Sequence, residues 1–147
     1  MSTSSEKYNE DYYMRGVECG LSLYSQYRWL PDLTIPMASR MCEELQIPVG
    51  AKVLDVGCAR GYLTYAMLLL SRDAYGTDCS HWAIYNAKPE LIEAERLIRV
   101  PEDWSLFAFS RWQFDIAIAK DVFEHMDPVT LMTCLRTLNK CCNRIFA

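Results

Sequence analysis

The stretch that decides the fold is KVLDVGCARG, residues 52–61, in which a short apolar run leads directly into a loop with a glycine at each end. The β-branched and leucine side chains of Lys52–Val56 predict a short buried strand. Beyond Gly61, apolar side chains recur at intervals of three and four residues, which predicts a helix. These side chains are Leu63, Ala66, Met67 and Leu70. The stretch is therefore expected to form a strand, a tight loop and a helix, the first part of a parallel βαβ unit.

The same alternation of strand and helix continues toward the C-terminus. Further strands are predicted over residues 74–78, 97–100, 114–119 and 144–147. Ser80 is an N-cap candidate for a short helix over residues 81–86, and Asp127 followed by Pro128 predicts the start of a longer one. Strands that alternate with helices across short loops imply right-handed crossovers and a parallel sheet with helices on its faces.

Two segments precede this pattern. Thr34 is an N-cap candidate for a helix that stops before Pro48, and its apolar stripe is formed by Ala38, Met41, Cys42 and Leu45. Residues 6–33 are rich in Tyr and Trp without a clean period, which predicts short helical pieces that lie on another surface. We expect one compact domain, in which residues 1–48 form a helical lid and residues 49–147 form a three-layer α/β core of about five strands.

The composition excludes several classes of protein. With 147 residues, of which 51% are hydrophobic and 23% charged, the chain is expected to fold around one core and not to be disordered. A net charge of −4 without a basic block argues against binding of nucleic acid. The longest apolar run, residues 66–70, is too short to cross a membrane, and the first twenty residues contain no apolar leader. The seven cysteines lack a CxxC pair, so we expect neither disulfides nor a zinc knuckle, and a cytoplasmic location.

The loop after the first predicted strand indicates the kind of ligand. Gly57 and Gly61 are separated by three residues that are not glycine, unlike the GxGxxG of a nicotinamide-binding loop. Asp55 would repel a pyrophosphate but would attract a cationic ammonium group. Asp78 ends the second predicted strand, where a carboxylate can bind both hydroxyls of a ribose. An amino acid joined to a nucleoside satisfies both aspartates.

Three stretches resemble motifs of the class I S-adenosylmethionine-dependent methyltransferases. VLDVGCARG, residues 53–61, is similar to the first motif, DxGCGxG, and YGTDCS, residues 75–80, to the acidic ribose-binding motif. FDIAIAKDVFEHM, residues 114–126, resembles the motif at the fourth strand. The resemblance implies a Rossmann-like fold, S-adenosylmethionine as cofactor and methyl transfer to a small-molecule acceptor.

The resemblance also implies roles for single residues. It places the first-motif loop against the methionine part of the cofactor, Asp78 at the ribose, Cys79 beside the adenine and the backbone of Lys120 near the methionine end. Glu102 and Asp103 are candidates to meet the adenine amino group. The full expected cofactor-binding set is Asp55, Gly57, Cys58, Ala59, Gly61, Tyr62, Asp78, Cys79, Lys120, Tyr27 and Arg28.

The chain departs from the family pattern in two ways. Ala59 stands where the central glycine is commonest, which is expected to require an ordinary backbone angle there and to narrow the loop. The family core has seven strands, whereas this chain stops in the fifth, so we expect the acceptor-side edge to be missing or to be supplied by a partner.

The aromatic N-terminal segment permits two interpretations. Tyr24, Tyr27, Arg28 and Trp29 are expected either to cover the cofactor, with ring faces near its sulfonium cation, or to pack on the edge of the sheet.

Asp121, Glu124 and His125 have the i, i+3, i+4 spacing that shares one face of a helix. His125 and Glu124 are the candidate catalytic residues, with His125 as a general base on an acceptor hydroxyl. A divalent metal, as in some quinone O-methyltransferases, is the less favoured alternative, and the other is that the pair only begins a helix. Cys58 lies at a helix start that lowers a thiol pKa, but no histidine is near it in the sequence, so we expect it to pack against a ligand.

Three functions remain in competition. The leading hypothesis is a methyltransferase that uses S-adenosylmethionine and a small-molecule acceptor. The alternative is a catalytically silent cofactor-binding module, completed by a partner chain or by dimerisation at the edge of the fifth strand. A nicotinamide-dependent oxidoreductase is disfavoured by the spacing of the loop glycines.

Overall fold

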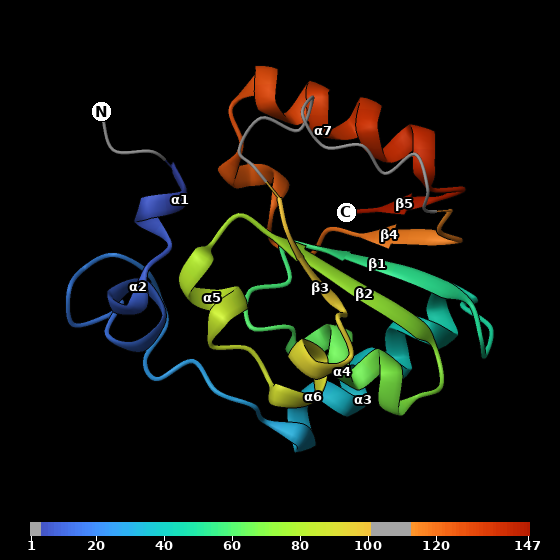
Figure 1. Ribbon diagram of the computed structural model, residues 1–147, viewed down its shortest axis with the longest axis horizontal. Helices are drawn as coiled ribbons and strands as arrows, with labels where there is room; N and C mark the ends of the chain where they lie inside the picture. Colours follow the sequence, from blue (N-terminus) through green and yellow to red (C-terminus); the bar gives the residue numbers. More distant parts are fainter. Residues whose placement is uncertain (1–3, 101–112) are drawn as a thin grey trace.

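A computed structural model describes residues 4–100 and 113–147 of the chain (Figure 1). Its centre is a five-stranded parallel sheet in the order β3-β2-β1-β4-β5. The strands are β1 (Lys52–Val56), β2 (Asp73–Asp78), β3 (Leu97–Arg99), β4 (Ile116–Ile118) and β5 (Ile145–Phe146). The predicted α/β fold with a parallel sheet is therefore confirmed. The order reverses at β1, and ligands of such sheets bind beyond the carboxyl ends of the strands near this point.

Helices cover both faces of the sheet. They are α1 (Ser4–Lys7), α2 (Glu10–Met14), α3 (Pro31–Glu44), α4 (Tyr62–Leu69), α5 (His81–Tyr85), α6 (Pro89–Glu93) and α7 (Pro128–Cys141), with a 3₁₀ turn, η2, at Phe123–His125. Figure 1 shows α3 and α4 on one side of the sheet and α7 on the other. In the described part of the chain, no helix combines the length and the hydrophobicity that a membrane span requires.

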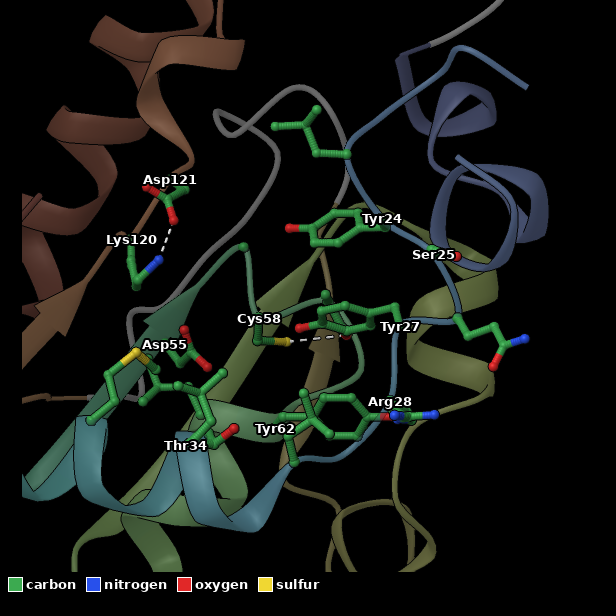
Figure 2. A pocket seen from close by; sticks show the side chains of 18 residues that line it. Tyr24, Ser25, Tyr27, Arg28, Thr34, Asp55, Cys58, Tyr62, Lys120 and Asp121 are labelled. Atoms are coloured by element: carbon green, nitrogen blue, oxygen red, sulfur yellow. Dashed lines mark hydrogen bonds and ion pairs between the residues drawn. The ribbon is translucent and has the colours of Figure 1, made fainter. Parts of the chain in front are cut away.

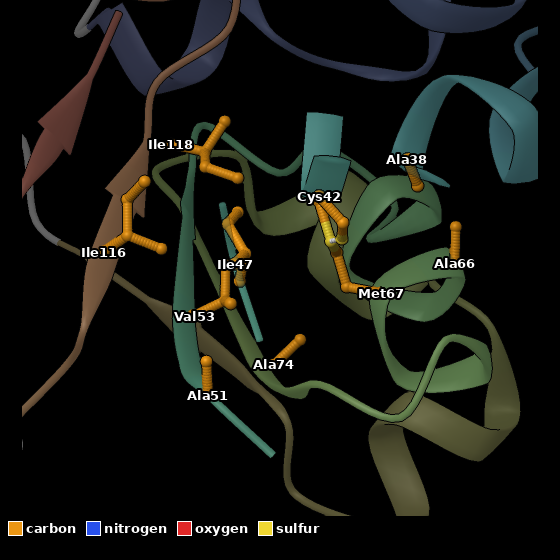
Figure 3. Close-up of a cluster of buried hydrophobic side chains, with 10 residues drawn as sticks. All are labelled: Ala38, Cys42, Ile47, Ala51, Val53, Ala66, Met67, Ala74, Ile116 and Ile118. Atoms are coloured by element: carbon orange, nitrogen blue, oxygen red, sulfur yellow. Dashed lines mark hydrogen bonds between the residues drawn. The ribbon is translucent and has the colours of Figure 1, made fainter. Parts of the chain in front are cut away.

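The alternation of side chains along β1 builds two cores. Val53 points toward α3 and α4, where it packs with Ala38 and Met67 (Figure 3). Leu54 points to the opposite face and packs with Leu138 of α7. Successive side chains of a strand face opposite sides, so the apolar run of β1 is buried on both.

The helix starts test the local predictions. Ser80 accepts a hydrogen bond from Ala83 N at 3.0 Å, and Asp127 accepts one from Val129 N at 2.9 Å, which confirms both predicted N-caps. The predicted start of the first long helix at Thr34 is wrong, because α3 begins at Pro31. Proline suits the first position of a helix, since its missing N–H would have no partner there.

The segment before α3 folds on itself beside the sandwich. Tyr27 N donates to Tyr13 O and Val17 N donates to Tyr24 O, each at 3.0 Å. α1 and α2 lie next to α5 (Figure 1), where Tyr13 stacks on Trp82 with ring centres 5.4 Å apart. The predicted short helical pieces are confirmed.

Candidate active site

The loop after β1 has a backbone of unusual shape. Gly57, Ala59 and Gly61 all have positive φ angles, of 70°, 50° and 74°. The amides of Gly57 and Cys58 donate to the carbonyl of Thr77 at 2.8 and 2.9 Å, which ties the loop to the end of β2. The expectation that Ala59 has an ordinary backbone angle is wrong. A left-handed alanine brings its Cβ close to the following carbonyl, so this position carries a conformational cost.

A second glycine explains the place of Cys58. A Cβ on Gly76 of β2 would lie 2.7 Å from both Cys58 Sγ and Thr64 Oγ1, so these side chains fill the space that the glycine leaves. Burial raises the pKa of the Cys58 thiol well above its usual value, and the charges of Asp55 and Asp78 act in the same direction. A nucleophilic cysteine requires the opposite shift. The environment of Cys58 therefore argues against a nucleophilic role, and its contact with a ligand stays a prediction.

Asp55 lies at the carboxyl end of β1 and is only 4% exposed. Burial raises its pKa to about 7, and the Asp78 charge also raises it, whereas the Thr64 hydroxyl, which donates at 2.8 Å, and Lys120 lower it. A buried carboxylate of this kind gains from a cationic ligand, because the cation replaces the lost hydration.

Asp78 at the end of β2 joins the two loops. One carboxylate oxygen accepts from Ala59 N and the other from Ser80 N, each at 2.7 Å. Burial raises its pKa, and the hydrogen bonds from the Ser80 and Ala59 amides oppose that shift. A carboxylate has about four acceptor sites, so each oxygen can still accept from a ligand hydroxyl.

Within the described residues, two adjoining cavities open over these aspartates. The larger, about 820 Å³, contains Asp55, and the smaller, about 430 Å³, contains Asp78. Both volumes lie within the range that is usual for small-molecule binding sites. The residues that line both cavities are Tyr24, Gly57, Ala59 and Asp121. The two spaces therefore meet at the first-motif loop.

Most of the expected cofactor residues border these cavities. The larger cavity is lined by Asp55, Gly57, Cys58, Ala59, Tyr62, Lys120, Tyr27 and Arg28 (Figure 2). The smaller cavity is lined by Gly57, Ala59, Asp78 and Cys79. Gly61 borders neither, since a Cβ there would meet Leu91 and Leu97. Of the catalytic candidates, His125 lines the smaller cavity and Glu124 lines neither. Glu102 and Asp103 lie outside the described residues.

The residues of the aromatic segment are divided between the larger cavity and the core, and the covering of a cofactor stays a prediction. Tyr24 and Tyr27 line the larger cavity, and their hydroxyls point to the side where Lys120 and Asp121 form an ion pair (Figure 2). Trp29 packs on the core instead, with its ring centre 5.3 Å from that of Tyr65.

Several lining residues are not among the predicted site residues. They are Tyr8, Tyr12, Tyr13, Val122 and Thr130 of the smaller cavity, and Leu23, Leu30, Leu33, Thr34 and Met37 of the larger. For the tyrosines, the aromatic richness of residues 6–33 was the available signal, whereas Val122 is recognisable only in space. Its Cγ2 lies 2.4 Å from where a Cβ of Gly57 would stand.

Asp121, Glu124 and His125 do not share one helix face. Asp121 has a φ of 56°, and the 3₁₀ turn that follows begins at Phe123. Among residues 4–100 and 113–147, no group of three or more His, Cys, Asp or Glu side chains is placed to hold a metal ion. A left-handed residue interrupts the regular spacing on which the helical expectation depended.

The chain is similar to a known family and to curated proteins. A family model described as "Methyltransferase domain" matches residues 31–144. The ubiquinone biosynthesis O-methyltransferase of Paraburkholderia phymatum is 32% identical over 94 residues, which cover 62% of this chain and 40% of that protein. The enzyme of the same name from Thiobacillus denitrificans is 28% identical over 121 residues, 79% of this chain and 51% of that protein. The chain thus spans about half the length of the curated relatives it matches.

Solved structures share the fold. The glycopeptide N-methyltransferase MtfA, complexed with S-adenosylmethionine, matches with a TM-score of 0.60 and 19% identity over 75% of this chain and 50% of that chain. Coclaurine N-methyltransferase matches with a TM-score of 0.59 and 22% identity over 75% of this chain and 33% of that chain. At such identities the likeness establishes the Rossmann-like fold alone. Because the family model spans α3, the strands β1 to β4, α7 and both aspartate loops, the chain belongs to the methyltransferase domain family.

Proposed function

We propose that the chain binds S-adenosylmethionine and transfers its methyl group to a small-molecule acceptor. The observation that carries this proposal is the pair of buried aspartates, Asp55 and Asp78, one in each of two cavities that meet at Gly57 and Ala59. When bound, S-adenosylmethionine supplies a methyl carbon on a cationic sulfur, activated for direct displacement.

The residues present fit this cofactor. Asp55 would bind its ammonium group and Asp78 its ribose hydroxyls. Cys79 and Val100 of the smaller cavity would flank the adenine. The rings of Tyr24 and Tyr27 would offer negative faces to the sulfonium cation.

The chain's own contribution to methyl transfer is alignment. A direct displacement needs the acceptor atom, the methyl carbon and the leaving sulfur in line, and holding them so removes much of the barrier. His125 is the candidate base for an acceptor that must lose a proton, since it lines the cavity that contains Asp78.

The outer wall of the larger cavity favours an apolar acceptor. Leu23 is 97% exposed, Leu33 is 63% exposed and Leu30 is 42% exposed, yet all three line this cavity. Exposed apolar side chains that gather at a pocket mark a binding surface. Two curated relatives are named for ubiquinone biosynthesis, so an acceptor from that process is the first to test.

Calorimetry tests the binding step. Titration of the purified chain with S-adenosylhomocysteine should show one site per chain, and NAD⁺ should show none. Absence of binding at millimolar S-adenosylhomocysteine by a chain that is folded by circular dichroism would contradict the proposal. Release of S-adenosylhomocysteine from S-adenosylmethionine in the presence of acceptors then tests transfer.

A second candidate is a cofactor-binding module that needs a partner chain or a second copy. The observation that favours it is β5, the outermost strand, whose Ile145 and Phe146 are 37% and 41% exposed. An open strand edge with apolar side chains is a template for pairing. Light scattering combined with the transfer assay separates the candidates, because this module would bind the cofactor but release product only in a larger assembly.

A further inference from the structure

Arg60 lies in the first-motif loop but lines neither of the two cavities described. Its guanidinium donates through Nη1 to Tyr27 O at 3.0 Å and through Nε to Asn86 O at 2.6 Å. It also lies 5.5 Å from the ring centre of Tyr62 and 5.6 Å from that of Trp82. One charged group therefore connects the N-terminal segment, the first-motif loop and the end of α5.

The segment that Arg60 holds, residues 8–29, is named here the aromatic lid. Within the lid, residues 13–17 are joined to residues 24–27 by three backbone hydrogen bonds, including Gln26 N to Met14 O at 2.9 Å and Tyr27 N to Tyr13 O at 3.0 Å. The tie at Tyr27 is therefore transmitted to the rest of the lid. The lid tyrosines that border a cavity are Tyr8, Tyr12, Tyr13, Tyr24 and Tyr27.

The second aspartate loop holds the other end of the lid. Ser80 Oγ donates to Tyr8 O at 2.5 Å while it accepts from Ala83 N at 3.0 Å. The two loops are themselves joined by the bond from Ala59 N to Asp78 at 2.7 Å. Each loop that carries a cofactor aspartate thus also carries a donor to the lid.

We propose that Arg60 is a positioning residue, which latches the aromatic lid over both cavities and thereby sets how fast a bound adenosyl ligand leaves. The identity of that ligand rests on the proposed function; the latch itself does not. Arginine suits this role because its planar fork donates to two acceptors at once and stacks on aromatic rings, whereas lysine provides a point charge on a flexible stem. Exchange of ligand requires the bond to Tyr27 to break.

Limited trypsin digestion of the ligand-free chain tests the latch. Arg15 and Arg28 are exposed cleavage sites within the lid. Arg60→Met keeps an apolar stem between Tyr62 and Trp82 but removes the donors, and cleavage after Arg15 and Arg28 should accelerate about tenfold, the loss expected for a charge-assisted hydrogen bond. Fragments are quantified by mass spectrometry.

Arg72 provides the matched control. It also donates to backbone carbonyls, of Ile47 and Leu70, each at 2.6 Å, but it precedes β2, at the opposite end of the sheet from the cavities. Arg72→Met should leave cleavage after Arg15 and Arg28 at the wild-type rate. Equal acceleration in both variants, or none in Arg60→Met, would overturn the latch.

Ligand release is the second measurement. The rate of S-adenosylhomocysteine dissociation should rise about tenfold in Arg60→Met, with little change in the association rate, and Arg60→Lys should restore part of the difference. An unchanged dissociation rate in Arg60→Met would overturn the inference and leave the proposed function intact. If the wild-type chain does not bind S-adenosylhomocysteine, the proposed function fails and the digestion alone decides whether Arg60 holds the lid.

Discussion

The two loops that hold the aspartates are built differently. The loop after β1 takes its shape from the backbone, with positive φ at Gly57, Ala59 and Gly61 and two amides bound to the Thr77 carbonyl. The loop after β2 takes its shape from one side chain, because the Asp78 carboxylate accepts from the amides of Ser80 and Ala59. Substitutions at the first loop should therefore act through backbone conformation and packing, and those at Asp78 through one carboxylate that both holds its loop and lines the smaller cavity.

The largest effect is expected from Asp55→Asn, next to the first loop, and it concerns the free energy of unfolding. The folded pKa of Asp55, about 7, is raised above its unfolded value near 4, so the stability it contributes is present below pH 4 and is lost as pH rises through 7. Above pH 7 the neutral amide should stabilise the fold, by about 4 kcal/mol at most, at 1.36 kcal/mol per pKa unit.

Urea unfolding at pH 5 and pH 8 measures this difference. The gain from Asp55→Asn should be larger at pH 8, while the affinity for S-adenosylhomocysteine falls because the ammonium group loses its partner. A gain that is equal at both pH values would show that Asp55 has an ordinary pKa.

Gly76→Val tests how the first loop packs against β2. A side chain there would displace Cys58 and Thr64, whose atoms lie 2.7 Å from the position of a Cβ, so overpacking should cost about 3 kcal/mol. Chemical denaturation measures the change. Adding Cys58→Ala should recover part of it, and a double variant no more stable than Gly76→Val would place the clash elsewhere.

Asp78→Asn tests the second loop. Loss of the charged acceptor should weaken binding of S-adenosylhomocysteine by roughly 1 to 3 kcal/mol, the scale of hydrogen bonds to charged groups, as measured by calorimetry. Asp115→Asn is the control, because Asp115 also accepts from a backbone amide, that of Lys52 at 2.7 Å, but at the other end of the sheet. Equal loss of affinity in both variants would contradict the ribose role of Asp78.

The smallest expected effect is that of Ala59→Gly. Glycine adopts a φ of 50° without the Cβ contact, so the variant should gain about 1 kcal/mol of stability. Thermal unfolding checks it, with Ala94→Gly as the control, since Ala94 has a φ of −86° and should gain nothing. A loss of stability in Ala59→Gly would mean that the loop relaxes the left-handed angle.

These differences also explain how far the sequence alone reaches. β1 begins and ends where the pattern predicted, and the caps Ser80 and Asp127 were found, because strand periodicity and capping depend on residues close in the chain. The N-cap of α3 is Leu30, four residues before the predicted Thr34, and it has no polar side chain to signal it.

The missed parts of the site depend on distant residues. The positive φ of Ala59 occurs in a loop whose amides donate to Thr77 and Asp78, nearly twenty positions away in the sequence. Tyr8 reaches the smaller cavity because Ser80 binds its carbonyl, across 72 positions. The sequence shows that the N-terminal segment is rich in aromatic residues, but it does not show which distant residues these side chains pack against.

Because the Cys58 side chain is packed over Gly76, the reactivity of its thiol reports how often the loop after β1 opens. An alkylating reagent attacks the thiolate form of cysteine. The Cys58 side chain is buried and its thiol pKa is raised, so labelling requires the loop to separate from β2. In a variant whose other cysteines are replaced, the ratio of the labelling rates without and with S-adenosylhomocysteine would measure how strongly the ligand stabilises the closed loop.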